Sequence, residues 1–116
     1  MSRDQLSTRH CTPIAAGTAP LGGEQALRLL AQLHADWTLS GDNTSISRSF
    51  GFSNYYQTLA FVNALAWIAH GEDHHPDLEV GYNRCLVRYS THAVGGLSEN
   101  DFICAARIDA LLPDAD

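Results

Sequence analysis

Three histidines and two aspartates lie close together in the C-terminal half of the chain. His74 and His75 directly follow Asp73, and His92 and Asp101 come further along. Histidine is the one side chain whose unperturbed pKa, about 6.5, lets it give and take a proton near neutral pH. A carboxylate nearby can hold an imidazole in its charged form. This group of residues therefore predicts acid/base chemistry on a small molecule.

Each of these residues also has a purely structural interpretation. A histidine pair on a surface loop, such as His74 and His75, is common, and a histidine at a strand end, such as His92, is more often solvated than catalytic. A carboxylate at the position of Asp101 is favoured by capping and by the helix dipole in any helix. The combination of these residues, more than any one of them, indicates a functional site.

Zinc binding is the alternative chemistry. The segment His70-Gly71-Glu72-Asp73-His74 resembles a zinc-protease motif in its histidine spacing, but it matches neither H-E-x-x-H nor H-x-x-E-H. With His75 and His92 added, a three-histidine site is conceivable, because a catalytic zinc ion needs only three protein ligands. We expect no metal and keep the zinc site as the weaker hypothesis.

Composition narrows the class of partner. The chain has 116 residues, which fits one domain, and its formal net charge is -6. Nonspecific affinity for nucleic acids comes mainly from clustered cations, so we expect no nucleic-acid partner. The three cysteines form no CxxC pair, and residues 1–23 contain no apolar run of signal-peptide length. These features predict reduced thiols, a cytoplasmic location and no membrane partner.

The N-terminal part of the chain divides at a glycine pair. Residues 1–23 are rich in proline and glycine and are expected to form a loose arm, whereas residues 24–116 are expected to form a single domain. Apolar residues recur at four-residue spacing from Leu29 to Trp37, which indicates a first helix over residues 24–35.

A hairpin and a second helix are predicted next. Strands over residues 37–39 and 44–52 flank a segment rich in turn-forming residues. Ser53 or Asn54 can cap the following helix, which should end near Gly71. Because this helix is apolar around much of its circumference, we expect it to be the most buried helix.

The remaining elements follow the histidine pair. Pro76 prevents the helix from continuing through that pair, so both histidines should lie on an irregular segment. Strands are predicted over residues 79–82 and 85–91. Ser98 matches the cap of a last helix, which Pro113 ends.

This order of elements, α-β-β-α-β-β-α, predicts an α+β fold: a four-stranded antiparallel sheet with three helices on one face. The uncovered face and the edge strands favour self-association, so we expect a homodimer or homotetramer. Strand alternation places His92 on the face opposite Tyr89, whereas Asp101 shares a helix side with Ala105. If the apolar residues of both elements meet in the core, His92 and Asp101 would lie on opposite sides of the sheet, unless the turn at Gly95-Gly96 brings them together.

Several motifs together resemble one known family. They are Asp73-His74-His75-Pro76, Tyr82-Asn83, Ser90-Thr91-His92, Gly96-Leu97-Ser98 and Asp101. In this register they are similar to the pterin-4a-carbinolamine dehydratases, also known as dimerisation cofactors of a homeodomain transcription factor. The close match runs from residue 73 to about 112, and a weaker one reaches back to Trp37.

The resemblance implies a reaction and a set of site residues. The reaction is dehydration of 4a-hydroxytetrahydropterin to quinonoid dihydropterin, which recycles the cofactor of aromatic amino acid hydroxylases. The resemblance also implies the same fold, a dimer or tetramer, and no metal or cofactor. The residues that it assigns are the catalytic and substrate-binding His74, His75 and His92, the pocket residues Pro76 and Thr91, and the supporting Asp73 and Asp101. A hydroxylase of the same pathway is the expected functional partner.

The family's second name implies an alternative function. The chain could be a non-catalytic dimerisation or binding module that acts as a transcriptional cofactor. The intact set of three histidines favours the enzyme, because a binding module has no need of them.

Overall fold

The computed structural model describes residues 3–112, and they form an α+β fold around one antiparallel sheet. The strand order is β1-β2-β4-β3. The strands are β1 (Thr38–Leu39), β2 (Ile46–Gly51), β3 (Asp77–Val80) and β4 (Arg84–Tyr89). The helices are α1 (Arg3–Ser7), α2 (Gly23–Leu30), α3 (Tyr55–Glu72) and α4 (Glu99–Asp109), with a short 3-10 helix, η1 (His92–Val94), before the last. The predicted fold class is confirmed.

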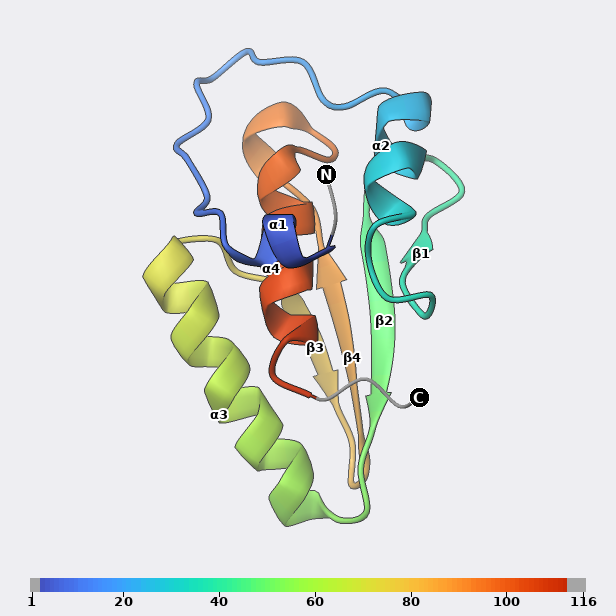
Figure 1. The fold of residues 1–116 in the computed structure, drawn as a ribbon, viewed down its shortest axis with the longest axis vertical. Coiled ribbons are helices and arrows are strands. Elements are labelled where there is room, and N and C mark those ends of the chain that lie inside the picture. The colour runs from blue at the N-terminus through green and yellow to red at the C-terminus, as the bar shows by residue number, and fades with distance from the viewer. Residues whose placement is uncertain (1–2, 113–116) are drawn as a thin grey trace.

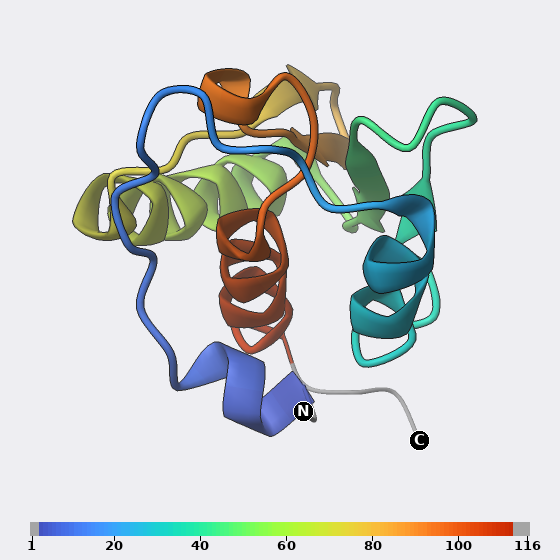
Figure 2. The same ribbon diagram turned by 90° about the horizontal axis from the view of Figure 1, so that it is seen from above.

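The helices are arranged in layers on the sheet. α2, α3 and α4 lie on one side of it, and α1 packs against α4 on the side away from the sheet (Figure 1 and Figure 2). The helix α1 is an addition to the predicted order. Among residues 3–112, no helix combines the length and apolar character that crossing a bilayer requires.

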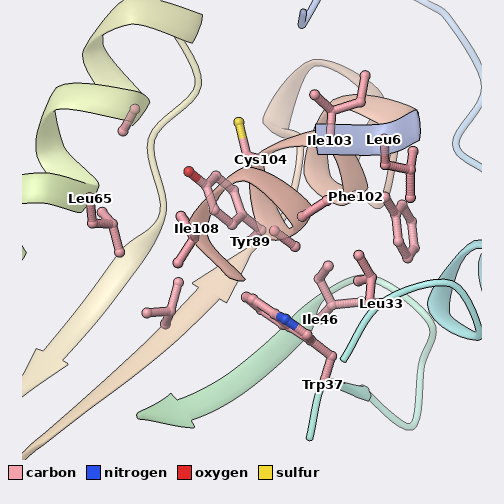
Figure 3. Packing of buried hydrophobic residues seen from close by; sticks show 14 of the residues in the cluster. Leu6, Leu33, Trp37, Ile46, Leu65, Tyr89, Phe102, Ile103, Cys104 and Ile108 are labelled. Carbon is pink, nitrogen blue, oxygen red and sulfur yellow. The ribbon is translucent and has the colours of Figure 1, made fainter. Parts of the chain in front are cut away.

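Strand alternation sets the sheet face that the helices cover. β2 and β4 pair from Ile46 opposite Tyr89 to Gly51 opposite Arg84. Tyr89 and Ile46 are fully buried, as are Cys85 and Val87. Side chains alternate between the two faces of a strand, so these residues share one apolar face. Figure 3 shows Tyr89 and Ile46 on the side occupied by Ile108 of α4.

The most buried helix is α4, so the prediction that the second long helix would be the most buried is wrong. Nine of the eleven residues of α4 are buried. By contrast, α3 exposes Tyr56 and Trp67, each about 80% accessible. The difference arises because α1 and the chain after it cover the side of α4 that the sheet does not, whereas nothing in the described chain covers the outer side of α3.

The N-terminal segment is packed, which differs from the predicted loose arm. Leu6 of α1 is fully buried in the core. Further along, the backbone N–H of Leu21 donates to the carbonyl of Leu97, 2.9 Å away. The Arg107 guanidinium of α4 donates to the carbonyl of Arg9, and the distance from Arg107 Nε to that oxygen is 2.8 Å. These partners are far away in the sequence, so local composition does not reveal them.

Candidate active site

The end of α3 releases the histidine pair from helical geometry. Asn54, one of the two predicted caps, accepts a hydrogen bond from the Gln57 N–H and starts the helix. At the other end Asp73 adopts the left-handed conformation, with φ of 52°. The next residue, His74, donates its backbone N–H to the carbonyl of Ala69 at 3.1 Å. This closes the helix C-terminus, and His74 and His75 then lie on an irregular segment before β3, as predicted.

A buried carboxylate holds the first histidine of the pair. His74 Nε2 lies 2.6 Å from Asp101 Oδ1. Asp101 is fully buried in the first turn of α4, where its Oδ2 also accepts hydrogen bonds from the Ser98 N–H at 2.9 Å and the Thr91 hydroxyl at 2.8 Å. The predicted capping interaction with Ser98 is confirmed. Asp101 thus caps α4 and orients His74 at the same time.

The environment of His74 favours its charged form. Burial by itself lowers the pKa of the imidazole, but the hydrogen bond and the negative charge of Asp101 outweigh burial and raise the pKa of His74 above its usual value. The Tyr89 ring stacks on the imidazole with centroids 5.1 Å apart, and the Tyr89 hydroxyl donates to the His74 carbonyl at 3.2 Å. Because Asp101 occupies Nε2, Nδ1 is the ring nitrogen that can face a substrate.

The three predicted histidines share one cavity. It has a volume of about 400 Å³, and the residues that line it come from four separate segments: Thr12, Pro13, Ile14, Asp73, His74, His75, Ser90, Thr91, His92, Ala93 and Asn100. Asp101 is absent from this lining and contacts the cavity through two lining residues, His74 and Thr91. Pro76 is also absent, which differs from its expected place in the pocket. Between the histidine pair and β3, the fixed φ of Pro76 shapes the backbone that carries both histidines.

His92 reaches this cavity because the sheet ends earlier than the sequence suggests. β4 stops at Tyr89 instead of Thr91. Thr91 then makes an isolated bridge to Gly96, and η1 begins at His92. Strand alternation does not extend past Tyr89, so the separation of His92 and Asp101 that alternation alone would give does not arise. Both connect to the same cavity, His92 directly and Asp101 through His74 and Thr91.

Sequence reasoning did not assign Thr12, Pro13, Ile14 or Asn100 to the cavity. Thr12, Pro13 and Ile14 belong to the segment predicted to be loose, and no motif marks them. Asn100 is 7% exposed at the start of α4. A polar residue in the first turn of a helix is ordinary, so its position gave no signal.

The hollow at the other end of β2 and β4 offers a poorer setting for proton transfer. This hollow of about 640 Å³ lies near Gly51 and Asn83, and Arg84 is the single ionisable side chain in its lining. Within residues 3–112, no three His, Cys, Asp or Glu side chains come together as potential ligands of one metal ion. The three-histidine zinc site of the weaker hypothesis is therefore not assembled in this part of the chain.

The raised pKa of His74 predicts how stability depends on pH. A pKa that is higher in the folded state contributes stability that is complete below the unfolded pKa, about 6.5, and is lost as pH rises through the folded value. Replacing His74 by Gln is therefore expected to lower the free energy of unfolding more at pH 6 than at pH 9. Urea unfolding of the unmodified and His74→Gln proteins at pH 6 and pH 9 measures the two losses. An equal loss of unfolding free energy at both pH values would contradict the pairing of a charged His74 with Asp101.

The fold and the site define a class of protein: an α+β domain with a carboxylate-paired histidine in a cavity that holds two further histidines. A sequence profile described as pterin 4 alpha carbinolamine dehydratase matches residues 19–111. The chain belongs to this family, and the family predicted from the motifs is confirmed.

Individual relatives agree over nearly the whole chain. A protein of Nitrosomonas eutropha that carries the name pterin-4-alpha-carbinolamine dehydratase is 62% identical over 107 residues, which cover 92% of this chain and 93% of the relative. A protein of Legionella pneumophila with the same name is 56% identical over 109 residues, which cover 94% and 96% of the two chains.

Two solved structures share the fold. A transcriptional coactivator/pterin dehydratase from Brucella melitensis superposes with a TM-score of 0.75 at 29% identity, over 79% of this chain and 97% of that one. A pterin dehydratase-like protein identified as a RuBisCO assembly factor in the alpha-carboxysome superposes with a TM-score of 0.58, also at 29% identity, over 67% and 90% of the two chains.

Proposed function

We propose that this protein is a hydro-lyase that dehydrates 4a-hydroxytetrahydropterin to quinonoid dihydropterin by histidine acid/base catalysis. The observation that carries the proposal is one cavity in which His74, paired with the buried Asp101, lies beside His75 and His92. The names of the relatives supply the substrate class. The chemistry of the cavity supplies the groups that such an elimination needs.

The reaction removes a hydroxyl from C4a and a proton from N5. Hydroxide is a poor leaving group, so the imidazolium of His74 donates a proton to the hydroxyl oxygen as the C4a–O bond breaks, and water leaves. A neutral imidazole, His75 or His92, takes the proton from N5 while the C4a=N5 double bond forms. Asp101 positions His74 and keeps it charged. The reaction involves no net electron transfer, so it requires no redox cofactor.

A physiological setting follows from this reaction. The quinonoid dihydropterin can be reduced again, so the enzyme would recycle the pterin cofactor of an aromatic amino acid hydroxylase, its expected partner in the pathway. We place the protein in the cytoplasm, without a nucleic-acid or membrane partner. The formal charge of -6 supports the absence of a nucleic-acid partner, because nonspecific nucleic-acid binding depends on clustered cations.

A direct assay tests the proposal. Purified protein is added to 4a-hydroxytetrahydropterin generated by an aromatic amino acid hydroxylase, and formation of the quinonoid product is followed by absorbance. We expect acceleration over the spontaneous rate, and the same acceleration from protein that was treated exhaustively with a chelator and freed of the chelator before the assay. A folded protein that gives no acceleration would contradict the enzyme and favour the binding module. Loss of activity in the treated protein, restored by added zinc, would favour the zinc site.

An exposed apolar surface on α3 supports self-association into a homodimer or homotetramer. It also favours the second candidate function, a binding module. Tyr56, Leu59 and Trp67 are exposed at helical spacing along α3. The names of the two structural neighbours include a coactivator and an assembly factor, which are roles in binding other proteins. Light scattering tests self-association: we expect a mass of at least two chains, and a monomer would contradict it.

A further inference from the structure

One side of the histidine cavity comes from the N-terminal part of the chain. Thr12, Pro13 and Ile14 line it together with residues from the segments that follow α3 and β4 and from the start of α4. We call residues 11–14 the strap. The family profile begins at residue 19, so the strap lies outside the part of the chain that the profile matches.

The first anchor of the strap is the Asn100 side chain, which forms hydrogen bonds with the backbone of Thr12. The amide of Asn100 accepts the Thr12 N–H at 3.1 Å and donates to the Thr12 carbonyl at 2.8 Å. Both backbone hydrogen-bonding groups of Thr12 are thereby satisfied, as they would be beside a neighbouring strand. Asn100 is buried and lies next to Asp101, so the strap is tied to the same turn of α4 that orients His74.

The second anchor is a carboxylate at the end of α3. Glu72 accepts the Cys11 N–H at 2.6 Å with one oxygen and lies 2.8 Å from His10 Nδ1 with the other. Burial by itself would raise the pKa of Glu72, but the hydrogen bonds from Cys11 and His10 and the charge of Arg107 outweigh it, and the pKa is lowered. Glu72 is absent from the lining of the cavity, and its contact with the strap is the hydrogen bond from the Cys11 N–H.

A third contact fixes the same point. The sulfur of Cys11 lies 3.4 Å from the sulfur of Cys104 in α4. Hydrogen bonds and sulfur contacts from two helices thus converge on residues 11 and 12. The two residues that follow, Pro13 and Ile14, contribute most of the apolar character of the cavity, because the remaining lining is polar except for Ala93.

We infer that the strap is part of the substrate site: Pro13 and Ile14 cover the bound pterin, and Glu72 and Asn100 are positioning residues that hold them over it. This inference rests on the proposed function. A flat heterocycle has two faces, and an apolar cover on the face away from the polar groups strengthens binding by removing apolar surface from water. The strap then contributes to affinity and leaves proton transfer to the histidines.

Two variants of the full chain test the inference. Glu72→Ala removes an anchor without touching the cavity, and Ile14→Ala trims the cover while both anchors stay. We expect KM for the pterin to rise about tenfold in Glu72→Ala, the scale of one lost hydrogen bond to a charged group, and to rise less in Ile14→Ala. In both variants kcat should stay within about twofold. In Glu72→Ala, hydrogen exchange of the Cys11 and Thr12 amides should also accelerate.

The matched control is Glu24→Gln, which removes a carboxylate from the exposed ion pair with Arg28 on α2 and should leave KM unchanged. An unchanged KM in both test variants of an active enzyme would overturn the inference and leave the proposed function standing. If the unmodified protein does not dehydrate the pterin, the proposed function fails. Calorimetric titration with 7,8-dihydrobiopterin then decides: weaker binding by Ile14→Ala supports the strap, whereas equal or absent binding overturns it.

Discussion

Replacing His74 by Gln is expected to lower kcat for dehydration of 4a-hydroxytetrahydropterin by about 10² to 10⁴, the usual contribution of one general acid. Glutamine can still donate a hydrogen bond to Asp101, but it cannot deliver a proton to the departing hydroxyl. Steady-state kinetics at saturating substrate measures the effect. KM should change much less than kcat, because His74 acts mainly on the transition state.

The control for this substitution is His70→Gln. His70 lies one turn earlier, is exposed, and is absent from the lining of the cavity. It should keep full activity. A His74→Gln protein that is folded and as active as the unmodified one would mean that the Asp101–His74 pair is a structural feature only. The acid would then have to be His75 or His92.

The second large effect concerns stability. Asp109, at the end of α4, accepts hydrogen bonds from Trp37 Nε1 at 2.9 Å and from the Arg48 guanidinium at 2.7 Å. The side chains of Asp109 and Arg48 are only 2% and 13% exposed. The guanidinium carbon of Arg48 also lies 4.2 Å from the centroid of the Phe50 ring. This network joins α4, β2 and the segment before β1 through one carboxylate.

Asp109→Ala is expected to lower the free energy of unfolding by about 3 to 5 kcal/mol, because it leaves the charge of Arg48 buried without a partner. Urea unfolding with linear extrapolation measures this loss. Asp109 is absent from the cavity lining, so kcat per folded molecule should not change. The exposed-pair variant Glu24→Gln serves again as control and should unfold like the unmodified protein. If Asp109→Ala had the same free energy of unfolding as the unmodified protein, the proposed role of the network would be contradicted.

Much of the fold could be predicted because it depends on local patterns. The alternation of Cys85, Val87 and Tyr89, the cap at Asn54 and the cap at Ser98 each depend on neighbours within a few residues. The irregular histidine segment follows from Pro76 in the same way. These features give the order of elements and place His74 and His75 outside a helix.

The parts that could not be predicted depend on partners far away in the sequence. Thr12 is held by Asn100, 88 positions away, and Trp37 by Asp109, 72 positions away. No pattern within either segment indicates these contacts. Alternation along β4 does not give the position of His92, because the strand ends at Tyr89 and the chain turns into η1.

The claim that the account depends on is that one pterin contacts three imidazoles in a single cavity. Nuclear magnetic resonance of the histidine rings during titration with 7,8-dihydrobiopterin tests it directly. The account predicts saturable shifts in the ring signals of His74, His75 and His92, with no shift for His34, which lies outside the cavity. Binding that leaves the signals of those three rings unchanged would contradict it.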